Sequence, residues 1–176
     1  MATENDSLYA IDADSANGQI LWQRSFLTSG LPGATSITPV PIDDVGGSIS
    51  PEVGITGTPV IDKATNTLYL VAKTKETVGG VAHYVQWIYA VNMSNGTNQT
   101  APFLIGDTTG SNTNNTPVYV YGSGDGSVID PYNGTGEPVV QFNALRENER
   151  LALSLVGGVV YAGWPRPAIS SRTTGG

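Results

Sequence analysis

The side chains best suited to chemistry are few and lie far apart in the sequence. His83 is the only histidine, and Arg146 and Arg150 enclose the run Glu-Asn-Glu. A histidine can serve as the base of a hydrolase, and arginine can hold a carboxylate through two hydrogen bonds. No nucleophile motif lies near His83, so we expect it in an exposed loop. The arginine pair indicates either an anion-binding loop or a solvated loop that pairs its own charges.

The three tryptophans, Trp22, Trp87 and Trp164, are candidates for stacking on a quinone or a sugar. Tryptophans within strands more often pack in a core, where each buries a large area. We therefore expect Trp22 and Trp87 to pack between sheets. Trp164 ends the last apolar run, where both interpretations stay open. It joins the histidine and the two arginines as a candidate ligand-binding residue.

Two glycine-containing segments resemble known loops only superficially. An EF-hand calcium loop needs an oxygen ligand at position five, glycine at six and glutamate at twelve. Counting from Asp12, these positions hold alanine, asparagine and glutamine, so a turn ending at Gly18 is predicted instead. Residues 122–126, Gly-Ser-Gly-Asp-Gly, lack the lysine of a phosphate-binding loop. The sequence thus predicts no metal site and no catalytic residue.

Composition narrows the classes of function further. The 176 residues suffice for one domain with a core. The formal charge is −7, with eight Lys plus Arg, which argues against nucleic acid as a partner because a phosphate backbone requires clustered cations. No apolar run is long enough to predict a transmembrane segment. Cysteine is absent, which excludes disulfides and thiol catalysis.

Six asparagines match the N-glycosylation pattern Asn-x-Ser/Thr: Asn5, Asn92, Asn95, Asn98, Asn114 and Asn133. A chain rich in Asn, Ser and Thr produces some of these by chance, but three fall within residues 92–100. If they carry glycans, the protein is extracellular or secreted. No signal peptide is recognisable at the start of the chain, so this interpretation treats the chain as a fragment.

Short apolar runs rich in β-branched and aromatic residues must position these side chains. We expect strands at residues 8–12, 19–26, 58–61, 67–72, 85–91, 101–105, 118–121 and 139–143, and a hairpin of 151–156 with 159–164 turning at Gly157-Gly158. The remainder is expected as a polar lead-in at 1–7, long Gly- and Pro-rich loops at 27–57 and 106–138, and a disordered tail at 165–176. No amphipathic helix is predicted.

The strands form an internal repeat. LYAIDADSANG at 8–18 matches IYAVNMSNG at 88–96, and TPVIDKATNTLYLVA at 58–72 matches LALSLVGGVVYAGW at 151–164. With strands lettered A to D, the chain reads C-D, then A-B-C-D, then A-B. The copies are about 80–90 residues apart, whereas a propeller blade takes roughly 40–50, and the long loops account for the excess. The strands are apolar on both faces, as expected for sheets stacked between neighbours.

This pattern resembles the PQQ-type β-propeller repeat, in which a Tyr-Ala-Leu-Asp-like strand precedes a glycine turn and a strand ending in tryptophan. The matching residues are Leu8–Asp12, Gly18, Leu21 and Trp22, and then Ile88–Asn92 and Gly96. Phe103 stands where the second copy would have its tryptophan. The resemblance implies all-β architecture with antiparallel four-stranded blades. About two blades are present, so we expect an incomplete propeller: half blade 8–26, full blade 58–105 and half blade 139–164.

The resemblance implies several classes of function. The first is a non-catalytic module for protein or glycan binding or scaffolding. The second is part of a PQQ-dependent dehydrogenase, a family that typically surrounds the quinone with an Asp base, Ca²⁺, a stacking Trp and often a vicinal disulfide. The chain has no cysteine and no assignable ligand set, so PQQ and calcium belong to this alternative alone. The third is a truncated product without independent function. Expected partners are a protein, a glycan, the remaining blades, or a second copy through open sheet edges.

Blade topology also predicts which residues share an end of the molecule. In an up-and-down blade the B–C and D–A connections emerge together, opposite the C–D turns. The first end should gather Lys73, Lys75, His83, residues 27–57 and Arg146–Arg150. The other end should carry Asn92, Asn95 and Asn98. We therefore expect ligand-binding loops at one end and glycans at the other.

Overall fold

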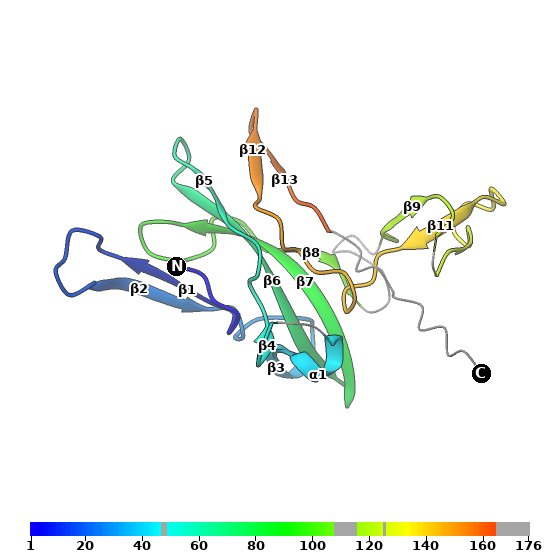
Figure 1. Cartoon of the computed structure of the whole chain (residues 1–176), viewed down its shortest axis with the longest axis horizontal. Coiled ribbons are helices and arrows are strands. Elements are labelled where there is room, and N and C mark those ends of the chain that lie inside the picture. The colour runs from blue at the N-terminus through cyan, green and yellow to red at the C-terminus, as the bar shows by residue number, and fades with distance from the viewer. Residues whose placement is uncertain (47–48, 108–115, 125, 165–176) are drawn as a thin grey trace, which may run out of the picture.

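The protein is all-β in a computed structural model described for residues 1–46, 49–107, 116–124 and 126–164 (Figure 1). The elements are β1 (Ser7–Ile11), β2 (Ile20–Ser25), β3 (Ala34–Pro41), α1 (Ile42–Val45), β4 (Glu52–Val53), β5 (Val60–Asp62), β6 (Thr67–Val78), β7 (Val81–Asn92), β8 (Phe103–Gly106), β9 (Tyr119–Tyr121), β10 (Val128–Ile129), β11 (Pro138–Gln141), β12 (Ser154–Val156) and β13 (Val159–Tyr161). The expected tail, 165–176, and Asn114 lie outside the described residues.

A long hairpin of β6 and β7 forms the centre of the molecule. Each strand has twelve residues, and the pairing runs without a break from Thr67 opposite Asn92 to Val78 opposite Val81. Gly79 and Gly80 close it with φ of 58° and 82°, the left-handed values that a two-residue hairpin turn requires. The sequence predicted a loop between two shorter strands. That prediction was wrong because residues 73–78 alternate between the sheet faces and the two glycines supply a tight turn.

The two strands of this hairpin and their neighbours β5 and β8 follow the predicted A-B-C-D order. β5 pairs with the start of β6, β6 with β7, and β7 with β8, all antiparallel. The sheet also contains β3, which pairs with the second half of β6, and β4, which pairs with the end of β3. Residues 27–57, expected as a loop, therefore contain β3, α1 and β4 between loop segments. β3 tolerates its prolines because most of its length has an open edge, where no ladder hydrogen bond needs the missing N–H.

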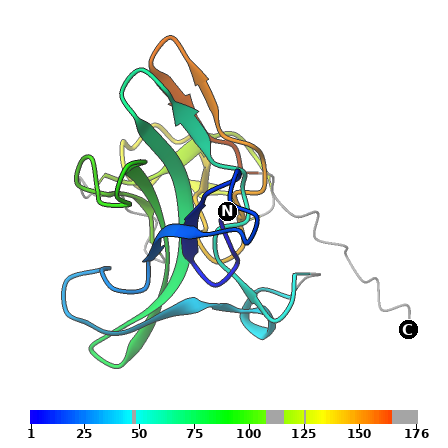
Figure 2. The same cartoon turned by 90° about the vertical axis from the view of Figure 1, so that its left-hand side faces the viewer.

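Both faces of the central hairpin are covered. On one face, Leu70 and Tyr89 pack against Leu8 and Phe26, which belong to the β1–β2 hairpin and its end. Figure 2 shows this hairpin in front of the long strands. The opposite face carries Lys73, over which residues 144–147 fold. Coverage on two sides explains why the central strands are apolar on both faces.

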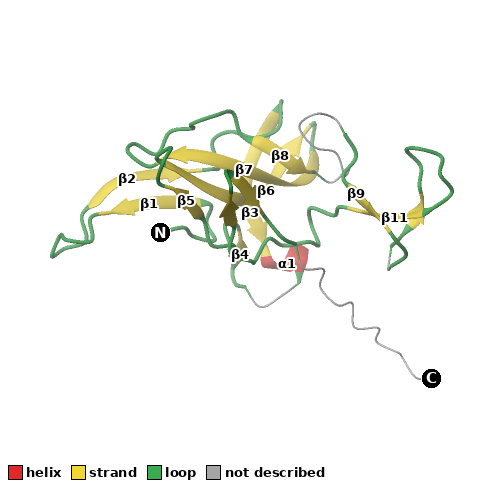
Figure 3. Ribbon diagram, turned by 90° about the horizontal axis from the view of Figure 1, so that it is seen from above, coloured by secondary structure: helices red, strands yellow, loops and turns green. Residues whose placement is uncertain are grey.

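The outlying strands depart further from expectation. The expected half blade 139–164 is divided, because β11 joins β9 and β10 in a separate sheet while β12 and β13 form a hairpin at Gly157-Gly158. Within residues 106–138, β9 matches the strand expected at 118–121, whereas β10 lies where a loop was expected. This sheet stands apart from the central one (Figure 3). The polar lead-in is also part of the fold, since Asp6 and Ser7 are buried. Within the described residues no sheet closes into a barrel or propeller.

Candidate functional site

The central hairpin separates two groups of polar residues, as the blade topology predicted. Lys75 and Tyr84 face each other near the glycine turn, whereas Thr67 and Asn92 face each other at the other end. Eight residues of extended strand span about 27 Å. The loops beside Lys75 and the turn after Asn92 are therefore distant from each other.

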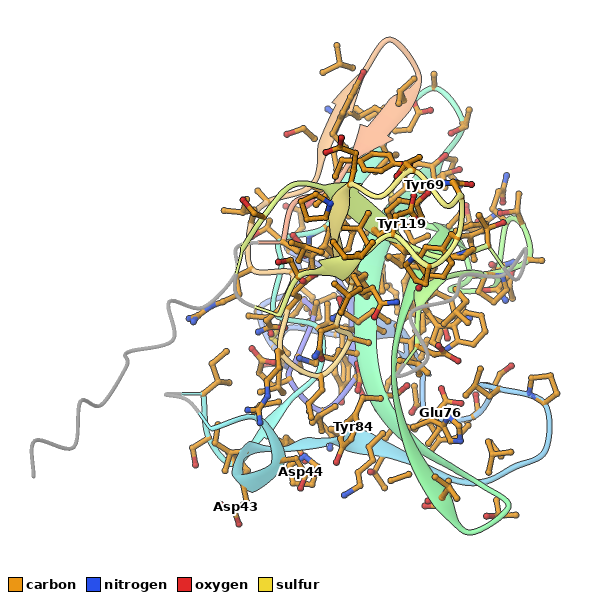
Figure 4. All side chains as sticks on the ribbon, turned by 90° about the vertical axis from the view of Figure 1, so that its right-hand side faces the viewer. Asp43, Asp44, Tyr69, Glu76, Tyr84 and Tyr119 are labelled. Atoms are coloured by element: carbon orange, nitrogen blue, oxygen red, sulfur yellow. The ribbon has the colours of Figure 1, made fainter. Side chains whose placement is uncertain are left out.

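A surface cluster forms where α1 meets the central hairpin. Asp44 accepts hydrogen bonds from Lys75 Nζ at 2.7 Å and from Tyr84 Oη at 3.0 Å. Arg146 Nη1 donates to the Val45 carbonyl at 3.2 Å, which joins the 144–150 segment to α1. Figure 4 shows Asp44 of α1 beside Tyr84. We call Asp43, Asp44, Lys75, Tyr84 and Arg146 the loop end.

The loop end holds its charges at neutral pH. The hydrogen bond from Lys75 lowers the pKa of Asp44 and raises that of Lys75. Desolvation raises the pKa of the Tyr84 hydroxyl. The Lys75 ammonium also lies 5.7 Å from the centre of the Tyr84 ring. Asp43 and Arg146 are exposed beside this pair. The arrangement offers a cation, an anion and an aromatic side chain to a polar ligand.

A buried clasp holds the 144–147 segment on the central hairpin. Lys73 Nζ donates to the Leu145 carbonyl at 2.9 Å, and Gln86 Nε2 donates to the Ala144 and Glu147 carbonyls at 3.0 and 2.6 Å. Burial lowers the pKa of Lys73 to about 8. These side chains satisfy backbone carbonyls that would otherwise be buried without donors. Their role is therefore to position the loop.

The four candidate ligand-binding residues are dispersed. Trp164 Nε1 donates to Gln86 Oε1 at 2.6 Å, and its ring meets Phe142 edge-on at 5.7 Å. The tryptophan thus extends the clasp. His83 lies in β7 opposite Glu76, half-buried, so the expected exposed loop position was wrong. It shares a sheet face with Glu76, opposite the face of Lys75. Arg150 is exposed.

Of those four residues, only Arg146 belongs to the loop end. Sequence reasoning missed Asp44 and Tyr84. The two aspartates that follow Pro41-Ile42 are a signal for a helix start, because acidic side chains favour the first turn. That pattern could have identified α1. Nothing in the sequence indicates that α1 packs beside β7.

Two carboxylates are buried away from the loop end. Asp6 and Glu149 are almost fully buried, and their oxygens accept no hydrogen bond of normal geometry. Desolvation raises the pKa of Asp6 well above its usual value and that of Glu149 to about 7. A side chain at Gly57 would collide with the Glu149 carboxylate, so glycine permits this close approach.

The asparagines of the six glycosylation patterns differ in their surroundings. Asn5, Asn92 and Asn133 each donate their amide nitrogen to another side chain: Glu52, Gln99 and Tyr119 respectively. Asn98 accepts a hydrogen bond from Arg24 at 2.6 Å. Asn95 is exposed, and its oxygen accepts from the Thr97 hydroxyl at 2.8 Å. These hydrogen bonds therefore engage the amide nitrogens of Asn5, Asn92 and Asn133 but only the oxygens of Asn95 and Asn98.

No protein-family model, curated protein or solved structure matches the chain. Among the residues that the structure describes, no group of three or more His, Cys, Asp or Glu side chains is placed to hold a metal ion. In those same ranges, no helix is both long and apolar enough to cross a membrane.

Proposed function

We propose that the chain is a two-blade portion of a PQQ-type β-propeller that binds a protein or glycan through the loop end. The observation that carries this proposal is a contact between the two repeat copies. Trp22, from the first copy, donates its Nε1 to the Met93 carbonyl at 2.9 Å. Its ring lies so close to Gly96 that an added Cβ would sit 2.7 Å from Trp22 Cε3. The tryptophan of one copy therefore docks on the glycine turn of the next.

Neighbouring strands extend this contact. Arg24, also from the first copy, donates to the Gly96 carbonyl at 2.9 Å. Its guanidinium lies 4.6 Å from the centre of the Phe26 ring, which itself packs on Tyr89 at 4.5 Å. In repeat proteins each unit buries its apolar face against the adjacent unit. A C–D hairpin lying on the following blade is the arrangement that a propeller requires.

The loop end supplies the binding surface. Ligand sites in such proteins use loops held by a rigid scaffold. Here the clasp of Lys73 and Gln86 fixes the 144–147 segment, and the Asp44 hydrogen bonds fix α1. Arg146 stands between these two segments with an exposed side chain. The buried polar groups stabilise the fold, and the exposed ones are available to a ligand.

Binding arrays test this proposal. The biotinylated chain is applied to arrays of glycans and of peptides, and each positive ligand is titrated against variants. Arg146→Ala should weaken binding about tenfold or more, since a charge-assisted hydrogen bond contributes roughly 1.5–3 kcal/mol. Asp43→Asn, at an exposed position, should weaken binding to a cationic ligand. Arg150→Ala is the matched control and should bind like the wild type.

Two results would overturn the proposal. One is the absence of any ligand on either array, and the other is equal loss with Arg146→Ala and Arg150→Ala. A separate experiment tests the dehydrogenase alternative. The chain is mixed with PQQ and Ca²⁺ and assayed for dye-linked alcohol oxidation. Turnover would replace the binding function with a catalytic one.

The proposed setting is extracellular, with glycans opposite the loop end. Asn95 is the acceptor that this geometry favours, because its side chain is exposed and the Thr97 hydroxyl already contacts it. Expression through a eukaryotic secretory pathway with an added signal peptide tests this. Asn95→Gln should remove the mass of one glycan. Asn133→Gln is the comparison, since its amide nitrogen donates to Tyr119 at 2.6 Å. Unmodified wild-type protein would contradict the prediction.

A further inference from the structure

We infer that the two half blades at the ends of this chain complete each other between copies, with β13 of one copy pairing along β1 of the next. This inference rests on the proposed propeller architecture and adds a partner, an edge and a register. The β1–β2 hairpin corresponds to strands C and D, whereas the β12–β13 hairpin corresponds to A and B. Joining them produces one four-stranded blade of the kind that β5–β8 form within the chain.

Each hairpin presents an edge for such pairing. In the described residues, β1 pairs as a strand only with β2, and β13 only with β12. Residues 1–3 run along the outer edge of β1 through a bridge between Ala2 and Leu8, but they do not form a strand. Large apolar side chains are exposed on both hairpins: Ile11, Ile20 and Leu21 on the first, and Val156, Val159 and Tyr161 on the second. Residues 151–164 contain no charged side chain, so no charge on β13 opposes the pairing. Uncharged edges that lack a full partner strand are the surfaces on which strands add.

The internal repeat predicts the register. LYAID at 8–12 aligns with IYAVN at 88–92, so Ala10 corresponds to Ala90. VVYA at 159–162 aligns with TLYL at 67–70, so Tyr161 corresponds to Tyr69. In the central hairpin, Tyr69 lies opposite Ala90. Tyr161 of one copy should therefore lie opposite Ala10 of the next copy.

The hydrogen-bonding edges independently agree with this register. In β12–β13, Val156 opposes Val159 across the two-glycine turn, so the backbone of Tyr161 points toward β12 and that of Ala162 points outward. On β1, the backbone of Tyr9 points outward, because its N–H and C=O each bond to Met1 at 2.8 Å. Ala162 and Tyr9 form a hydrogen-bonded pair when Tyr161 opposes Ala10. In the single chain residues 1–3 occupy this edge, since Ala2 bridges to Leu8 and the Thr3 N–H donates to the Ser7 carbonyl at 3.0 Å, so this segment must move aside.

The added strands continue a packing layer that already exists. Within one chain, β1–β2 lies on the central hairpin through Leu8 and Phe26. Strands placed beside β1 extend this layer toward β5 and the start of β6. In this arrangement the A strand β12 of one copy lies near the A strand β5 of the next copy. A contact between these two A strands also occurs inside the chain, where β12 contacts β5 and the Leu153 N–H donates to the Thr58 carbonyl at 3.0 Å. The contact between copies thus repeats the contact within one copy.

The interface uses different surfaces on the two partners, so it generates a ring if the rotation closes. Each copy contributes about two blades, and propellers contain about four to eight. The expected assemblies are therefore rings of about two to four copies. Light scattering should give a multiple of the 18.3 kDa chain mass.

Disulfide cross-linking tests the register without interference, because the natural chain has no cysteine. Ala10→Cys combined with Tyr161→Cys places thiols at a non-hydrogen-bonded pair, where Cβ atoms approach closely enough for a disulfide. Mild oxidation should convert most chains into covalent multimers on a non-reducing gel. Ala10→Cys combined with Val160→Cys shifts one partner to the other face and should leave mostly single chains.

The outcomes separate this inference from the proposed function. A dilute wild-type chain that remains an 18.3 kDa monomer overturns the inference. Equal cross-linking of both cysteine pairs, with each variant shown to be folded by circular dichroism, also overturns it. A monomer that still binds ligand through Arg146 contradicts only the assembly. Multimers with the correct register and no ligand contradict only the binding function.

Discussion

Glu149 is buried without a hydrogen-bond donor of normal geometry, and this has a consequence for stability. Removing a carboxylate from water disfavours its charged form, which is why its pKa is raised to about 7. Folding therefore favours the protonated acid. The favourable contribution is complete below the ordinary pKa of 4.5 and is lost as pH rises through about 7.

We predict that the chain loses stability between pH 4.5 and 7, and that Glu149→Gln removes much of this dependence. The expected loss is on the order of 3 kcal/mol, from the size of the pKa change. Urea unfolding at several pH values measures it. Asp6, whose pKa is raised in the same direction, should leave a residual slope in the variant. Glu137→Gln, at an exposed position, is the control, and a wild-type curve that is flat over this window would contradict the prediction.

The contact between β2 and the turn after β7 permits a second prediction. Gly96→Ala places a methyl group 2.7 Å from the Trp22 ring and also forces a side chain into a φ of 74°. Gly18→Ala meets only the backbone cost, since φ is 60° and the nearest atom is 3.8 Å away. Backbone strain costs about 1–2 kcal/mol in each variant, and overpacking adds about 1–3 kcal/mol in the first.

Chemical unfolding of the two glycine variants distinguishes these costs. Gly96→Ala should be less stable than Gly18→Ala by the overpacking contribution alone. Trp22→Phe, combined with Gly96→Ala, should recover part of the loss because the smaller ring leaves room for the methyl group. Equal stability of the two single variants would mean that Trp22 does not dock on the turn.

Local patterns predicted the elements that depend on neighbouring residues. The strands at 8–12 and 58–61 and the hairpin at Gly157-Gly158 were confirmed because β-branched residues and turn glycines specify them directly. β3 was missed because a strand with prolines forms only at a sheet edge, and no local pattern shows that β6 pairs with one side of β3 while most of the other side stays open. The length of the central hairpin was also missed, since the polar residues 73–76 resemble a loop until Lys73 and Glu76 find buried hydrogen bonds.

The candidate site was also predictable only in part. Blade topology placed Lys75 and Arg146 at one end, and the structure has them there beside α1. Asp44 and Tyr84 meet only through tertiary packing, which no local pattern reports. Trp164 was left open and now has a structural role, because its indole N–H satisfies the buried oxygen of Gln86.

Across the molecule, burial is concentrated at the central hairpin. Leu70 and Val85 are fully buried, whereas Val120 and Ile129 in the β9–β11–β10 sheet are 66% and 64% exposed. Local opening is easiest where few apolar groups are buried. The single chain therefore has a stable centre and weakly supported outer sheets.

Native-state hydrogen exchange should reveal this gradient and the proposed assembly together. We predict that the amides of Leu70 and Val85 exchange only through global unfolding, while those of β9 and β10 exchange through low-energy local opening.

In the single chain the Val160 amide points to an open edge, so it should exchange rapidly. In a multimer it pairs with β1 of the next copy and should become protected, with the protection lost on dilution. Protection of Val160 that does not change with concentration would contradict pairing between copies, and protection of β9 equal to that of β7 would contradict the gradient.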